Sequence, residues 1–132
     1  YLLGLSDDDP HAIVLRKGRI SGGLTGADSA GVLLRSDERF VQGTWLHLRL
    51  DVIVNDNGDV VVQPFRNDLD VHPLGAAPDW QPIPGMPLFI DDHLGINSGS
   101  APLSSGRAGF GFATADVTRR AFFDHIELSR QL

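Results

Sequence analysis

The sequence predicts an all-β fold in which two antiparallel sheets pack as a sandwich. Residues 46–54 place apolar side chains at every second position, which is the period of a half-buried strand. Residues 55–59, Asn-Asp-Asn-Gly-Asp, have turn chemistry, and the β-branched residues 60–65 return as a partner strand. A strand of about ten residues spans roughly 33 Å, so its apolar face needs a second layer to cover it. No stretch shows convincing helical periodicity.

Length and composition indicate a single domain over residues 1–132. The contents of 42% hydrophobic and 21% charged residues are typical of a globular protein. The formal charge of −6 argues against a nucleic-acid partner, which would require a basic face. The absence of cysteine excludes a disulfide framework and a cysteine-ligated metal. No apolar run reaches the ~20 residues of a membrane span, so membrane insertion is not expected, and no signal-peptide pattern is visible.

Three further strands are predicted before the long hairpin. Residues 2–5 form a short apolar edge strand, and the acidic residues 6–10 form a turn. Residues 11–16 and 30–35 form the second and third strands. The polar residues 36–39 are then expected to turn the chain toward the hairpin.

Residues 67–105 are predicted to form a long, mostly irregular loop. The segment holds six of the eight prolines and contains no Lys or Arg. Because proline lacks an amide donor, it is confined to loops and sheet edges. We expect large apolar side chains to pin this loop to the fold: Trp80, Ile83, Met86, Leu88 and Phe89. Irregular loops of this length are usually functional, so this one is the first place to look for a partner site.

Two more strands are expected after the loop. Residues 106–113 alternate small and aromatic side chains, and the glycines there permit close packing against another segment. Residues 121–128 form the last predicted strand.

The order of these motifs resembles concanavalin A-like jelly rolls, and among them the laminin G-like group. The resemblance is carried by the strand that opens at residues 44–50, the Gly-Asp hairpin, and the segments 106–112 and 122–128. It implies two curved antiparallel sheets that bind sugar, protein or calcium at their loops or on the concave face. The amino-acid sequence of residues 1–5 and 91–97 also resembles that of accessory proteins of tailed-phage particles that carry this jelly roll. That second resemblance implies a virion or extracellular location.

No catalytic residues are predicted. Glucanases of the concanavalin A-like fold resemble one another in a Glu-x-Asp-x-Glu strand that carries the nucleophile and the acid. This chain has only two glutamates, Glu38 and Glu127, and neither lies in that spacing. A Gly-x-Ser-x-Gly nucleophile elbow is also absent. The chain is therefore not expected to be an enzyme.

Calcium is the candidate metal, and no cofactor is required. Asp91 and Asp92, followed by Asn97 and Ser98, offer hard oxygen ligands of the kind that calcium prefers. The alternative is that these side chains cap turns of their own loop. The five histidines show no spacing typical of a transition-metal site.

A saccharide site is the second candidate. Trp45, His47 and Arg49 belong to the outward set of the long strand, and Trp80 and Asn97 come from the long loop. If these five residues converge, they combine an aromatic platform with hydrogen-bonding groups. The alternative is that Trp45 closes the end of the core and that Trp80 only pins the loop.

Three functions are compatible with these observations. The leading hypothesis is a non-catalytic interaction module that serves as a structural or attachment component of a larger assembly such as a phage virion. Its partners would be protein subunits, including further copies of itself. The alternative is a carbohydrate-binding, lectin-like module that recognises a cell-surface glycan, and the third hypothesis is a polysaccharide-active enzyme.

Overall fold

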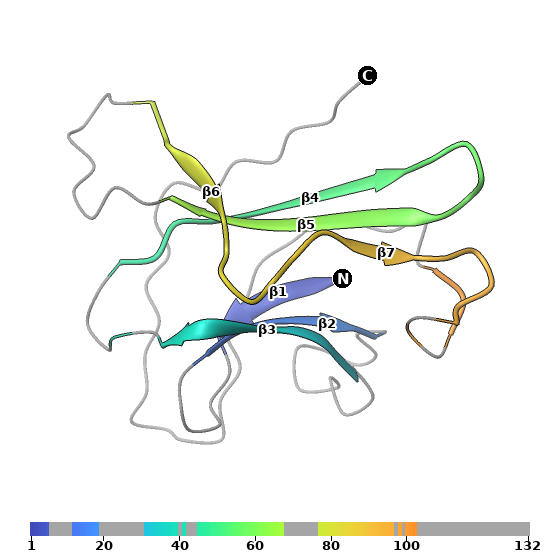
Figure 1. The fold of residues 1–132 in the computed structure, drawn as a ribbon, viewed down its shortest axis with the longest axis horizontal. Coiled ribbons are helices and arrows are strands. Elements are labelled where there is room, and N and C mark those ends of the chain that lie inside the picture. Colours follow the sequence, from blue (N-terminus) through green and yellow to red (C-terminus); the bar gives the residue numbers. More distant parts are fainter. Residues whose placement is uncertain are drawn as a thin grey trace, which may run out of the picture.

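A computed structural model of the chain describes residues 1–5, 12–18, 31–39, 41, 45–67, 77–96, 98 and 100–102. Within these residues the fold is all-β, and two antiparallel sheets lie one above the other (Figure 1). The first sheet contains β1 (Leu2–Leu5), β2 (Ala12–Lys17) and β3 (Gly31–Arg39). The second sheet contains β4 (Leu48–Val54), β5 (Val60–Asn67), β6 (Trp80–Pro82) and β7 (Phe89–Asp91). The predicted two-sheet antiparallel sandwich is confirmed.

The first sheet has the order β1-β2-β3, with β2 in the centre. The predicted turn at residues 36–39 is wrong, because β3 continues as a strand to Arg39. The register between β2 and β3 shifts between Ala12 and Val14. At this irregularity the buried Ser36 hydroxyl accepts a hydrogen bond of 3.0 Å from the Ile13 N–H. The Ser36 side chain thus replaces a backbone hydrogen bond that the shifted ladder does not make. The polar residues 36–39 therefore continue the strand instead of ending it.

The predicted hairpin joins β4 to β5. Asn55 organises its turn, since its side-chain oxygen accepts hydrogen bonds from the backbone N–H groups of Asn57 and Asp59 at 3.0 and 2.9 Å. The Asn55 N–H also donates to the Asp59 carbonyl at 2.9 Å. Gly58 has φ of 83°, a left-handed conformation that L side chains rarely adopt. Turn chemistry therefore accounts for the acidic tip of this hairpin.

Pro64 lies in the middle of β5, and hydrogen bonding explains why it is tolerated there. Two backbone hydrogen bonds fix the pattern of the β4–β5 ladder: Asn55 N–H donates to the Asp59 carbonyl, and Asn67 N–H donates to the His47 carbonyl. In this register the odd-numbered residues of β4 and β5 therefore form the hydrogen-bonded pairs. The backbone nitrogen of Pro64 therefore points away from β4. On that side β7 pairs only with residues 60–62 and β6 only with residues 65–67. The missing N–H coincides with the break between the two short strands.

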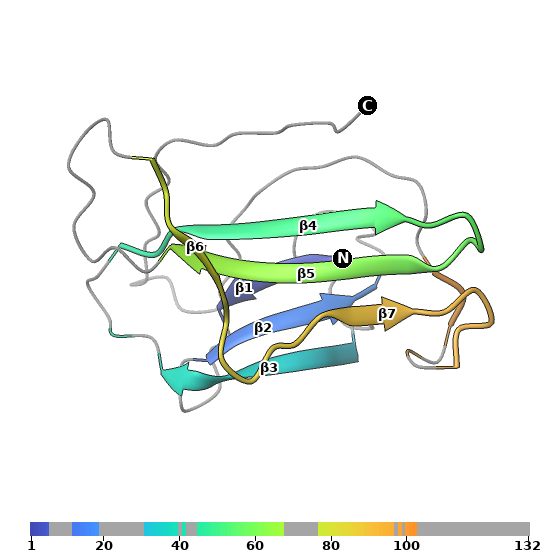
Figure 2. The same ribbon diagram turned by 45° about the horizontal axis from the view of Figure 1, so that its top comes forward.

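The segment between β6 and β7 leaves the second sheet at this break and reaches the first (Figure 2). Met86 N–H donates to the Ile83 carbonyl at 2.9 Å, and Gly85 has φ of 79°. Pro and a left-handed Gly at the two central positions are typical of a type II turn. The Pro84 carbonyl accepts a hydrogen bond of 3.0 Å from the Asp37 N–H at the edge of β3. The loop therefore covers a sheet edge that would otherwise be open.

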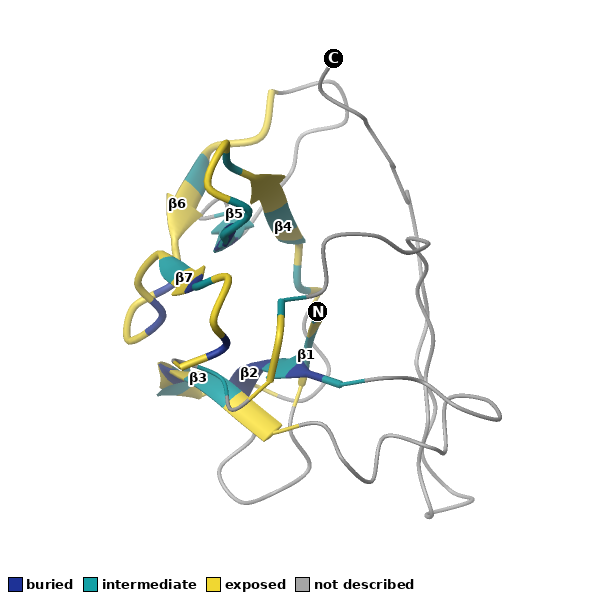
Figure 3. Ribbon diagram, turned by 90° about the vertical axis from the view of Figure 1, so that its right-hand side faces the viewer, coloured by how far each residue is buried: buried dark blue, intermediate teal, exposed yellow. Residues whose placement is uncertain are grey.

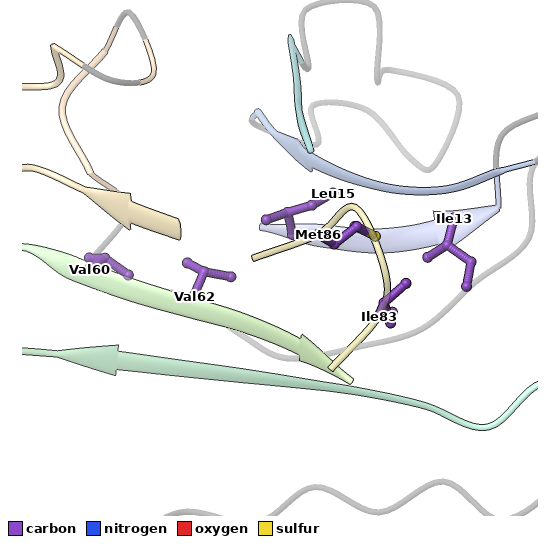
Figure 4. Close-up of a cluster of buried hydrophobic side chains, with 6 residues drawn as sticks. All are labelled: Ile13, Leu15, Val60, Val62, Ile83 and Met86. Carbon is purple, nitrogen blue, oxygen red and sulfur yellow. The ribbon is translucent and has the colours of Figure 1, made fainter. Parts of the chain in front are cut away.

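The core lies between the sheets and includes this loop. The buried apolar cluster draws side chains from β2, β5 and the loop (Figure 4): Ile13, Leu15, Val60, Val62, Ile83 and Met86. Ile83 and Met86 thus pin the long proline-rich segment, as predicted, whereas the expectation that Leu88 also pins it is wrong, because Leu88 is exposed. The sequence did not predict that β6 and β7 lie within this segment. The expected strands at 106–113 and 121–128 lie outside the described residues.

Burial along β4 follows the predicted alternation only in part. Leu48 and Leu50 pack against the core cluster. Val52 and Val54 share their face, yet 45% and 48% of their surface is exposed. Figure 3 shows this change from intermediate to exposed along the strand. The far half of β4 extends beyond the part of the core that the described residues build.

Candidate functional site

A buried ion pair joins the two sheets at one end of the core. Lys17 follows Ile13 and Leu15 at alternate positions of β2, so it points inward with them. Asp91 lies opposite the buried Val60 in the second sheet. The Lys17 Nζ and Asp91 Oδ2 atoms are 2.7 Å apart, and the two side chains are 4% and 0% exposed. This contact is therefore a cross-link between the layers, fully removed from solvent.

Neighbouring polar groups complete the bonding of this pair. Ser98 Oγ donates to Asp91 Oδ1 at 2.6 Å, and the Tyr1 hydroxyl donates to Oδ2. Lys17 Nζ also donates to Ser98 Oγ at 2.6 Å and to the Ser100 carbonyl at 2.5 Å. Buried charges are tolerated when their hydrogen-bonding capacity is used in this way.

The protonation state of Asp91 follows from the same contacts. Burial by itself raises the pKa of the carboxyl group, because it disfavours the charged form. Hydrogen bonds from Lys17, Ser98 and Tyr1, together with the charge of Lys17, lower the pKa by more. The net pKa of Asp91 lies below its ordinary value, so the group is a carboxylate at neutral pH.

The two aspartates predicted to bind calcium have separate roles in this structure. Asp91 faces Lys17, whereas Asp92 Oδ1 accepts hydrogen bonds from the Leu94 and Ile96 N–H groups at 3.0 and 3.1 Å. In the part of the chain that the structure describes, no group of three or more His, Cys, Asp and Glu side chains is close enough to hold a metal. Asn97 lies outside the described residues, and calcium binding stays a prediction.

The second sheet turns its other face away from the core. Val60 and Val62 point into the core, so the odd-numbered residues of β5 point outward. Residues paired across antiparallel strands share a face. The registers Arg49↔Phe65↔Pro82 and Asn67↔Trp80 therefore place these five residues on the outer face of the second sheet.

An aromatic–ionic patch occupies the β6 end of this outer face. It consists of Arg49, Asp51, Phe65, Asn67 and Trp80. Arg49 makes a two-pronged ion pair with Asp51, with Nε–Oδ1 and Nη2–Oδ2 distances of 2.7 and 2.6 Å. Its guanidinium carbon also lies 5.3 Å from the centroid of the Phe65 ring, within cation–π range.

Asn67 connects the edges of this patch. Its N–H donates to the His47 carbonyl at 3.1 Å, and its side-chain nitrogen lies 3.4 Å from His47 Nδ1. Its side-chain oxygen accepts a hydrogen bond of 3.0 Å from the Asp79 N–H, just before Trp80. The structure thus brings three of the predicted ligand residues, His47, Arg49 and Trp80, to one region.

Trp45, another predicted ligand residue, is not part of the patch. Trp45 is 66% exposed, so it does not close the end of the core. No hydrogen bond or ring contact joins Trp45 to the patch within the described residues. Asn97 lies outside them.

An apolar row crosses the β7 end of the outer face. The registers place Ile53, Val61 and Ile90 side by side on β4, β5 and β7. Ile53 and Ile90 are 51% and 45% exposed, and Val61 between them is partly covered. The exposed Leu88 precedes β7 by one residue. Aliphatic side chains from three strands therefore form one continuous, partly exposed row.

The sequence contained a signal for the residues that our prediction missed. Ile13, Leu15 and Lys17 continue one alternating face, so the only lysine of the chain occupies the next buried position. Phe89 and Asp91 alternate in the same way. A charge at the end of a buried alternation predicts a buried partner of opposite charge.

The comparisons with known proteins concern the whole chain. No protein-family model, curated protein or solved structure matches it. In the described part of the chain, no helix is long and apolar enough to cross a membrane. The function is therefore inferred from the chemistry of the molecule's own surfaces.

Proposed function

We propose that this chain is a non-catalytic β-sandwich interaction module, a structural or attachment component of a larger assembly such as a phage virion. The observation that carries the proposal is the apolar row Ile53–Val61–Ile90 on the outer face of the second sheet. Contiguous exposed aliphatic side chains rimmed by polar residues are typical of protein contact sites. The charged residues of the aromatic–ionic patch supply such a rim on one side.

The contacts of Asp91 support a non-catalytic role. An enzyme of the carboxylate type needs an acidic side chain that is accessible to its substrate. Asp91 is fully buried and both its oxygens are bonded, to Lys17, Tyr1 and Ser98. The sequence resemblance to laminin G-like jelly rolls and to accessory proteins of tailed phages supports an assembly role at a virion or in the extracellular space.

Light scattering after size exclusion, together with sedimentation velocity, tests the proposal. We expect a mass above that of one chain, and we expect Ile90→Asp to reduce it, because a carboxylate in the apolar row opposes burial. Val32→Asp is the matched control, since Val32 is an exposed aliphatic of the first sheet. A chain that stays monomeric and binds no protein of its source particle overturns the assembly role.

A carbohydrate-binding module is the second candidate, and the aromatic–ionic patch favours it. Trp80 and Phe65 supply apolar ring surface beside the hydrogen-bonding groups of Asn67, Arg49 and Asp51. A glycan array tests this candidate with Trp80→Ala, and with Trp45→Ala as a variant outside the patch. Binding lost on Trp80→Ala alone selects the carbohydrate function. Polysaccharide hydrolysis by the unmodified chain would instead select the enzyme.

A further inference from the structure

The outer edge of β4 carries unused backbone groups in the described part of the sheet. The odd-numbered residues of β4 bond to β5, so the N–H and C=O groups of Leu48, Leu50 and Val52 point the other way. No described residue pairs with them, and β4 ends the strand order β4-β5-β6. Such an edge is a template for another strand.

The side chains beside this edge are also incompletely covered. Val52 and Val54 lie on the inner face, yet nearly half of each is exposed. A strand added alongside β4 would extend the inner layer and cover them. Among the described residues, neither the backbone groups nor the side chains of this edge have a neighbouring strand.

We propose that this neighbour is β4 of a second copy of the chain, paired antiparallel about a two-fold axis that passes beside Leu50. The inference rests on the proposed interaction function and names one of its partners and one of its surfaces. In this register Leu50 lies opposite Leu50 of the second copy, and Arg49 lies opposite Asp51 of the second copy. A two-fold axis makes the second Arg49–Asp51 contact identical to the first.

The two β4 strands must place their apolar side chains on the same face of the sheet, and this limits the registers in which they can pair. Paired residues share a face, so only registers that oppose even-numbered with even-numbered residues keep the apolar face continuous. Centring the pair on Val52 leaves both charges without a partner across the axis. Centring it on Asp51 or on Arg49 places like charges directly opposite each other, which is unfavourable. The register centred on Leu50 is the one that opposes Arg49 to Asp51.

Hydrogen bonding agrees with this register. The edge-facing residues Leu48, Leu50 and Val52 would form the hydrogen-bonded pairs across the axis. Arg49 and Asp51 would then occupy the non-hydrogen-bonded pairs, where opposing side chains approach more closely. Within one chain these two side chains already form an exposed pair on the outer face. Because exposed ion pairs contribute little energy, the charges select the register while the backbone bonds and the buried valines supply affinity.

A charge-swap experiment on the full chain tests the proposal. Arg49→Asp and Asp51→Arg each place like charges at both symmetric contacts, and each is expected to raise the dimer Kd about tenfold or more. The double variant Arg49→Asp/Asp51→Arg restores opposite charges and is expected to restore the dimer. Light scattering and sedimentation velocity measure the association. Failure of the double variant to recover overturns the register.

A proline variant tests the edge itself. Val52→Pro removes an N–H that points away from β5, so the hairpin ladder keeps its bonds while the edge loses a donor. We expect loss of the dimer with an unchanged β-type circular dichroism spectrum. An assembly that is insensitive to Val52→Pro and to the charge variants but sensitive to Ile90→Asp overturns β4 pairing and leaves the interaction module standing. A wild-type chain that is monomeric throughout, and binds no particle protein, overturns both.

Discussion

Lys17 and Asp91 face each other across the core and compensate each other's charge at a site that is buried from solvent. Removing one partner leaves an uncompensated buried charge, which is expected to cost about 3–5 kcal/mol of unfolding free energy. Lys17→Met and Asp91→Ala should both show this loss in urea denaturation. Lys17→Met/Asp91→Leu should lose much less, because an apolar pair replaces the ionic one.

The exposed pair Arg49–Asp51 is the matched control for that prediction. Arg49→Ala should change stability by no more than about 1 kcal/mol, since solvent screens the pair. Equal losses from the buried and the exposed pair would contradict the role assigned to burial.

The contact between Asp59 and His93 should be sensitive to acid. A hydrogen bond from the His93 side chain, and then bonds from the Asn55 side chain and the His93 N–H, lower the pKa of Asp59 from 3.8 to about 2. Because the folded pKa is depressed, the contact stabilises the fold fully above pH 3.8, and this contribution is lost as pH falls toward about 2. Carbon-13 NMR titration of the carboxyl group measures the pKa directly.

Two variants provide the comparison for this titration. Asp59→Asn should lose its stability deficit relative to wild type as pH falls through that window. His93→Ala, which removes the main donor to Asp59, should show the same convergence. An Asp59 carboxyl that titrates at its ordinary value would show that the His93 contact is not formed in solution.

Gly85 should tolerate no side chain. Its φ of 79° disfavours L residues, and a Cβ atom would lie 2.6 Å from the Asp37 backbone nitrogen. Gly58 has a similar φ of 83°, but its added Cβ would lie 3.9 Å from its nearest neighbour. Gly58→Ala should therefore cost about 1–2 kcal/mol from conformation alone, and Gly85→Ala distinctly more. Chemical denaturation measures both, and equal costs would refute the close approach of the turn to β3.

Truncation of Met86 should destabilise the sandwich. The side chain is fully buried between the sheets, so Met86→Ala is expected to cost about 2–5 kcal/mol. Leu88→Ala, two residues later in the same loop, should stay within about 0.5 kcal/mol because Leu88 is exposed. Thermal and urea unfolding of the pair test whether the loop is part of the core.

Alternation along the chain predicted much of this fold. Residues 46–54 and 60–65 were correctly interpreted as a hairpin because Asn55 and Gly58 carry unambiguous turn chemistry. The strand β1 was predicted with the bounds that it has. The strands β6 and β7 were not predicted, because three residues are too few to show a period and prolines surround them.

The candidate site was harder to predict, because its residues become neighbours only through the pairing register of the strands, which a single sequence does not reveal. The outward set of the long strand was correct for Arg49, yet Phe65 and Asn67 become its neighbours only through the β4–β5 register. Ile53, Val61 and Ile90 are separated in sequence and meet only across three strands. Polar residues at 36–39 were interpreted as a turn, although Ser36 in fact replaces a ladder bond.

The missing amide hydrogen of Pro64 has a consequence for the way in which the protein unfolds. It opens the gap through which residues 83–88 cross to the neighbouring layer and accept a bond from Asp37. One loop is thereby shared by both sheets, so neither sheet can separate without disturbing the other. The sandwich should melt as one cooperative unit, with the Asp37 amide exchanging its hydrogen as slowly as those of the central strands.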